Sequence, residues 1–170
     1  MPSEPHQDPI LDFVTNQAMR QRSDTDTARC YDLLATRVPA PPGTRVSAAE
    51  IERAAQVLTV LNLFATDVAE QIAGFAGHTG FTPELANQCS AADHAARAAV
   101  LLTGALAAAT AAHRDQAPAT RNGAHRTALA AAADELRAAS LVLMYGRSAV
   151  RTPTATASRV AGTQPSSPRR

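Results

Sequence analysis

Apolar residues recur every three or four positions along the middle of the chain. The run consists of Ile51, Ala54, Leu58, Leu61, Ala65, Val68, Ile72 and Phe75. This spacing places all of them on one face of an α-helix, as in the seam of a coiled coil. Ser47-Ala48-Ala49-Glu50 precedes the run and is typical of a capping box, which satisfies backbone N–H groups of the first turn. We therefore expect a helix over 48–77, ended by Gly77 in the left-handed conformation.

Two shorter helices are expected before this one. Asp8-Pro9 is typical of a helix start, with an N-cap residue followed by proline at the first helical position, and predicts a helix over 9–22. A polar break at 23–27 follows, and the apolar spacing then predicts a helix over 26–38. The prolines that come next cannot continue it.

Two long helices are expected after it. Thr82-Pro83-Glu84 predicts the start of a helix over 83–114. Its predicted buried stripe is Leu85, Cys89, Ala92, Ala96, Ala99, Leu102 and Leu106. A turn containing Asn122-Gly123 is expected next, and then a helix over 124–145 in which Leu129, Leu136 and Leu143 lie seven residues apart. Gly146 is expected to end that helix.

These elements predict an all-α fold. Short loops between long helices favour antiparallel neighbours, so we expect an Ala-rich up-and-down bundle of three long helices with the N-terminal helical segment packed on it. The bundle domain would cover 9–146. Residues 1–8 are expected to be disordered, and residues 147–170 are expected to form a disordered basic tail because they contain hardly any large apolar residue.

The amino-acid composition also predicts that the core of the bundle is thin. The chain has 45% hydrophobic and 18% charged residues, which is typical of a globular domain, but only 4% aromatic residues and no Trp. Cys30 and Cys89 are too isolated for a disulfide framework or a zinc site, so we interpret them as small buried residues in a reducing compartment. No secretory signal is expected, and the uncharged run 98–112 is too short for a membrane span, so we expect a soluble cytoplasmic protein.

The sequence offers little catalytic chemistry. It contains no Glu-x-x-His pair of the kind that holds metals in helical bundles, and the outward heptad positions of Asp67 and Glu70 predict a solvated face. The glycines at 74, 77 and 80 follow a helix and lack a Gly-Lys-Ser/Thr ending, so they indicate a helix end and not a phosphate loop. We expect no cofactor, no metal and no enzymatic activity.

A second apolar stripe makes the long central helix apolar nearly all round. It consists of Val57, Val60 and Phe64, joined by Leu63. Two interpretations remain open: the helix is central and buried by every neighbour, or the stripe is an interaction surface for an unidentified protein partner or a second copy in a homodimer.

His94 gives an alternative hypothesis. It follows the predicted seam residue Ala92 by two positions, which turns it about 200° away and toward solvent. With Arg97 three positions on and Gly104 further along, this segment resembles histidine phosphotransfer domains, in which a surface His accepts a phosphoryl group. The resemblance covers Asp93 to Gly104; Arg97 replaces the family's usual Lys, and Ala98 replaces its Gly. It implies a phosphoacceptor role for His94.

The Arg-rich C-terminal end gives a second alternative. Its basic residues are Arg147, Arg151, Arg159, Arg169 and Arg170. They offer at most about five phosphate contacts, without the interleaved aromatic residues of single-strand binders, so nucleic-acid binding through them would be salt-sensitive and non-specific. The sequence thus favours a non-enzymatic helical protein that acts in protein–protein interaction or regulation, with phosphotransfer and accessory nucleic-acid binding as alternatives.

Overall fold

The computed structural model describes residues 8–18, 20, 22–40, 47–80, 82–114 and 120–146, and the secondary structure within them is helical. The helices are α1 (Pro9–Ala18), α2 (Asp24–Arg37), α3 (Ala48–Thr79), α4 (Pro83–Arg114) and α5 (Thr120–Tyr145). The predicted all-α class is therefore confirmed. Disorder was predicted for 1–8 and for 147–170. Of these residues the structure describes only Asp8, which caps the start of α1.

Local hydrogen bonds explain where the first four helices begin. Oδ1 of Asp8 accepts the N–H of Ile10 at 2.9 Å, and Oγ1 of Thr82 accepts the N–H of Leu85 at 3.2 Å, as expected for the starts of α1 and α4. The capping box predicted for α3 is present: Glu50 accepts the Ser47 N–H at 2.7 Å, and Oγ of Ser47 accepts the Glu50 N–H at 3.2 Å. These polar residues fix the starts independently of the core.

Several predicted boundaries differ from the structure. Ser23 and Asp26 form a second capping box, so α2 begins at Asp24 and the predicted polar break at 23–27 is largely its first turn. α1 ends at Ala18 and not at residue 22, and α5 begins at Thr120, so the predicted Asn122-Gly123 turn lies inside that helix.

Glycines with positive φ end two helices. α3 continues past Gly77 to Thr79 and ends at Gly80, whose φ is 68° and whose ψ is −164°, so Gly80 does not adopt the left-handed helical conformation predicted for Gly77. Only glycine adopts this region without strain, so either residue was a plausible end. Gly146, at φ 79°, follows α5 as predicted.

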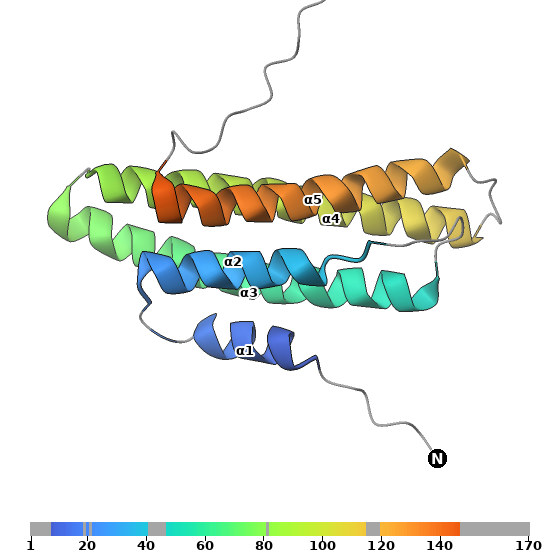
Figure 1. Ribbon diagram of the computed structural model, residues 1–170, viewed down its shortest axis with the longest axis horizontal. Coiled ribbons are helices and arrows are strands. Elements are labelled where there is room, and N and C mark those ends of the chain that lie inside the picture. The colour runs from blue at the N-terminus through green and yellow to red at the C-terminus, as the bar shows by residue number, and fades with distance from the viewer. Residues whose placement is uncertain are drawn as a thin grey trace, which may run out of the picture.

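The helices run alternately up and down along the long axis of the molecule (Figure 1). α5 packs most extensively against α4 and also against α2, while α3 packs against α4 and, less extensively, against α2. α2 is thus the fourth helix of the bundle, and α1 lies on its outside against α3 and α2. The predicted bundle of three long helices with an N-terminal helical segment packed on it is confirmed: α3, α4 and α5 are the long helices, and α1 and α2 form the segment.

The core is apolar and rich in alanine, but α4 buries a different stripe from the one predicted. Its buried residues are Leu85, Ala86, Ala91, Ala95, Ala98, Leu102, Ala105, Ala109 and Ala112. Cys89 and Ala96, both predicted to be buried, are exposed. Leu85 and Leu102 are buried as predicted, and Ala99 and Leu106 are partly buried against the core. The prediction was wrong for Cys89 and Ala96 because alanines occur on every face of this helix, so their positions do not distinguish one face from another.

Length and composition alone would also allow part of α4, Pro83–Ala112, to cross a membrane. The core helix of a bundle meets the same criteria, and α4 packs here against α3 and α5.

Candidate functional site

His94 on α4 and Glu135 on α5 form a pair across the helix interface. Nδ1 of His94 lies 2.6 Å from Oε2 of Glu135, and the two side chains are 15% and 26% exposed. His94 was predicted to face solvent. This expectation was wrong because the buried stripe of α4 runs through Ala91, Ala95 and Ala98, which turns His94 toward α5.

This pair has a defined chemistry. An ionised carboxylate only accepts hydrogen bonds, so Nδ1 of His94 carries the proton and donates a hydrogen bond to Glu135. In the neutral imidazole, the lone pair then belongs to Nε2, which becomes the nucleophilic or basic atom. Glu135 therefore fixes the tautomer of His94 and holds the ring in one orientation.

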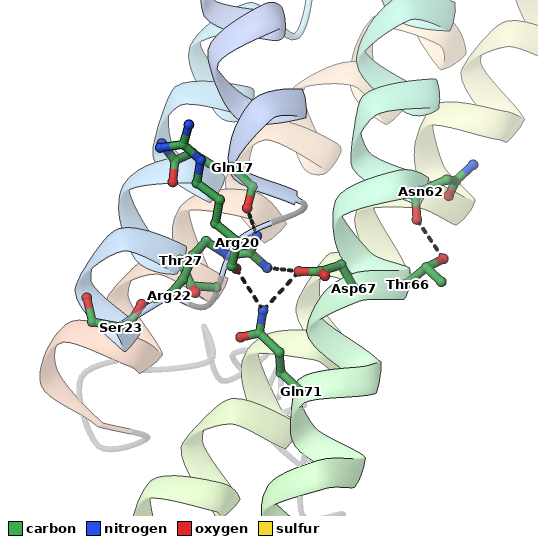
Figure 2. Close-up of polar contacts among 9 residues, drawn as sticks. All are labelled: Gln17, Arg20, Arg22, Ser23, Thr27, Asn62, Thr66, Asp67 and Gln71. Carbon is green, nitrogen blue, oxygen red and sulfur yellow. Dashed lines mark hydrogen bonds and ion pairs between the residues drawn. The ribbon is translucent and has the colours of Figure 1, made fainter.

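A buried arginine joins the first two helices to α3. The side chain of Arg22 is only 1% exposed, and its guanidinium donates to the carboxylate of Asp67 and to the backbone carbonyl of Gln17 (Figure 2). Its Cζ lies 4.4 Å from the centroid of the Phe64 ring, a cation–π distance. Asp67 was predicted to lie on a solvated face; it is 25% exposed and binds Arg22 instead.

The tie between the α1–α2 connection and α3 has a second part. Nε2 of Gln71 donates to the carbonyl of Arg20 at 3.3 Å and to Oδ2 of Asp67 at 3.0 Å, as Figure 2 shows. Sequence reasoning missed Arg22 because a lone arginine in a polar stretch is normally solvated. The Ser23–Asp26 capping box, by fixing the start of α2, was the signal that would have placed Arg22 at the helix entrance.

A small cavity lies beside this arginine. Its volume is about 20 Å³, and its lining includes Arg22 and Tyr31, whose Nε and hydroxyl are buried without a hydrogen-bond partner. The Tyr31 ring meets Phe64 edge-on at 5.3 Å, and burial raises the pKa of its phenol. A cavity of this size accommodates one water molecule and no organic ligand.

The two cysteines have different surroundings. Cys30 is buried, as predicted, and burial raises the pKa of its thiol to about 11, so it remains protonated and unreactive at neutral pH. Cys89 is exposed, so the prediction that both thiols are buried was wrong for it. In the part of the chain that the structure describes, no three His, Cys, Asp or Glu residues are grouped to hold a metal ion.

A second histidine of interest is His125, which sequence reasoning missed. It is fully buried on α5, and its Nδ1 lies 2.7 Å from the carbonyl oxygen of Ala105 on α4. Since a carbonyl only accepts, Nδ1 donates and Nε2 has the lone pair, which finds no partner. We interpret His125 as a residue that fixes the alignment of α4 with α5.

The predicted interaction surface on α3 is mostly buried. Val57 and Phe64 are completely buried within the single chain, and Val60 is partly buried against the core. Leu63 is 45% exposed. The predicted surface was wrong for Val57 and Phe64 because α3 is covered by α1 and α2 as well as by α4. The other interpretation, in which α3 is a central helix buried by its neighbours, therefore applies to these two residues.

A different apolar row is exposed at the end of α5. Leu141, Met144 and Tyr145 are 42%, 45% and 68% exposed. Their spacing of three and four residues places them on one face of the helix. The basic residues proposed to contact nucleic acid, Arg147, Arg151, Arg159, Arg169 and Arg170, lie outside the described residues.

Comparisons with family models, with curated proteins and with solved structures found no match to this chain.

Proposed function

We propose that this chain is a non-enzymatic helical protein that binds a partner protein through the exposed face at the end of α5. The row of Leu141, Met144 and Tyr145 carries the proposal. Single exposed apolar residues are common on protein surfaces, but three large ones at spacings of three and four form a continuous stripe. A stripe of this kind fits against an amphipathic helix of another protein, which would bury all three side chains together.

A capture experiment with matched variants tests this surface. The full chain, the double variant Leu141→Ser/Met144→Ser and the control Val100→Ser are each immobilised and exposed to lysate of the source cell. Val100 is 72% exposed on α4, outside the stripe, so its replacement removes a similar apolar side chain. We expect a protein that the wild type and the control retain and that the double variant loses.

Thermal melting by circular dichroism first establishes that both variants stay folded. A captured set that is identical for all three proteins would overturn the proposed surface. If the retained protein is a second copy of this chain, sedimentation velocity shows a dimer for the wild type and the control and a monomer for the double variant.

The contact between His94 and Glu135 favours a second candidate, a phosphotransfer protein. In this reaction, the Nε2 lone pair attacks the phosphorus of an acyl phosphate on a response regulator. The N–P bond forms as the P–O bond to the aspartyl carboxyl group breaks, and the released carboxylate keeps the electron pair. Glu135 would position the ring through Nδ1, at 2.6 Å.

Intact-mass measurement after incubation with a phosphorylated response regulator tests this candidate. We expect an acid-labile phosphate that His94→Gln abolishes, that Glu135→Gln slows, and that the control His78→Gln on α3 leaves unchanged. A wild-type chain that gains no phosphate, or a His94→Gln variant that gains it equally, would exclude His94 as the acceptor.

A further inference from the structure

An open groove lies between α5 and the end of α2. Its volume is about 420 Å³, which falls within the range of small-molecule sites. Most of its lining is apolar and comes from both sides: Ala35, Val38, Pro39, Leu129, Ala130 and Ala133. The groove therefore suits the aliphatic part of a ligand.

The charged residues of this groove are unevenly paired. Arg137 donates from Nη1 to Oδ1 of Asp134 at 2.8 Å, so these two charges largely cancel. Arg126 also lines the groove, and it is the charge left over. Two guanidinium groups and one carboxylate leave a net charge of +1, which favours an anionic ligand.

Arg126 presents a particular set of unused donors. Its Nε and Nη2 are buried and have no hydrogen-bond partner. These two nitrogens belong to the same edge of the guanidinium, where their N–H bonds point in parallel and match the two oxygens of a carboxylate. Leaving them unpaired and away from water is unfavourable, so a partner that accepts from both is strongly preferred.

We propose that this groove binds a small aliphatic carboxylic acid. The carboxylate binds side-on to Nε and Nη2 of Arg126, and the hydrocarbon chain lies along the alanine, leucine and valine side chains of the groove. Because the two nitrogens are covered in the structure, the Arg126 side chain turns this edge toward the groove when the ligand binds. This site is separate from the proposed partner surface, which consists of Leu141, Met144 and Tyr145 at the end of α5.

The net charge distinguishes a carboxylate from a phosphate. A carboxylate brings one negative charge, which the net charge of the groove balances. A phosphate monoester brings about 1.5 to 2 negative charges at neutral pH and would leave part of that charge uncompensated beside Asp134.

Isothermal titration calorimetry, in which octanoate is added to the full chain, tests the site. Octanol and octyl phosphate serve as the uncharged and the more highly charged ligands. We expect saturable binding of octanoate, at least about tenfold weaker binding of octanol, and octanoate binding at least about tenfold weaker in Arg126→Gln. Arg97→Gln, which removes a surface arginine outside the groove, should bind octanoate as the wild type does.

Two further measurements keep the result unambiguous. Ala130→Phe fills the groove without changing its charge and should also abolish binding, and the Nε–H resonance of Arg126 should shift in nitrogen-correlated NMR spectra as octanoate is added. The proposal is overturned if the wild type does not bind octanoate, if Arg126→Gln or Ala130→Phe binds it equally well, if Arg97→Gln loses binding to the same extent, or if octyl phosphate binds more tightly.

Discussion

Arg22 is a charged residue with almost no contact with water. Its guanidinium relies on Asp67, the Gln17 carbonyl and the face of Phe64 in place of hydration. Asp67 is 25% exposed and so keeps part of its own hydration. The two partners of this ion pair are therefore unequal, since one can return to water and the other cannot.

This asymmetry predicts different costs for the two halves of the pair. Asp67→Asn leaves a buried cation without its counter-charge and should lower the free energy of unfolding by about 3 kcal/mol. Arg22→Met retains much of the apolar contact with Phe64 and leaves a carboxylate that water can reach, so it should stay within about 1 kcal/mol of the wild type. Urea denaturation of both variants measures the difference, and equal costs would contradict the unequal burial.

Cys30 gives a prediction at alkaline pH. Burial raises the pKa of its thiol from 9.0 to about 11, so between these values the unfolded chain releases this proton while the folded chain keeps it. The contribution of Cys30 to stability is therefore complete below pH 9 and is lost as the pH rises toward 11. Urea denaturation across this range should show a steeper loss of stability for the wild type than for Cys30→Ala.

Cys89→Ala is the matched control, because this thiol is exposed. Its pH dependence should match that of the wild type. The buried Tyr31 phenol, whose pKa is also raised, contributes to the same alkaline loss in all three proteins. A Cys30→Ala profile parallel to the wild type would mean that the thiol ionises equally in both states.

At the level of the helix, α4 shows how alanine hides which face is buried. Ala98 is completely buried and Ala96, two positions earlier, is exposed. Ala98→Leu would force extra methylene groups into a close helix contact and should cost about 1–3 kcal/mol. Ala96→Leu should change the free energy of unfolding by no more than about 0.5 kcal/mol. Thermal denaturation of the two variants checks the orientation of α4. A larger loss of stability for Ala96→Leu than for Ala98→Leu would favour the buried stripe predicted from the sequence.

Helix starts were predictable because they depend on neighbouring residues. Asp8, Ser47 and Thr82 accept the backbone N–H groups that the sequence pattern implied. The late end of α3 was not predictable in the same way, because Gly77 and Gly80 are both suited to that role. The early start of α5 was missed because Asn122-Gly123 is a turn signal that the helix overrides.

The site residues required information that lies between helices. The pairing of His94 with Glu135 depends on how α4 and α5 face each other, and the alanines of α4 do not encode that orientation. Arg22 meets Asp67 only after α1 and α2 fold onto α3. Sequence reasoning therefore found His94 as a candidate but assigned it the wrong surroundings.

For the whole molecule, the burial of α3 within one chain has a direct test. Leu61 is completely buried and Leu63, on the same helix, is 45% exposed. Leu61→Ala should cost about 2–5 kcal/mol, because it creates a cavity in the core. Leu63→Ala should change stability by no more than about 0.5 kcal/mol, because no core contact is lost. Urea denaturation measures both.

Sedimentation of the same two variants separates a core from an interface. If Leu63 formed part of a contact between copies, the midpoint of unfolding of the wild type would rise with protein concentration, and Leu63→Ala would weaken or remove that dependence. We expect Leu63→Ala to leave the sedimentation behaviour and the concentration dependence of the midpoint as they are in the wild type.

The alanine-rich contact between α4 and α5 has a thermal consequence. The heat capacity of unfolding grows with the apolar surface that becomes hydrated, and alanine exposes little of it per residue. We therefore expect calorimetry to give a heat capacity change of unfolding below the usual ~12–15 cal/mol/K per residue. A small heat capacity change flattens the curve of stability against temperature, so this bundle should lose little stability in the cold and unfold over a broad range when heated.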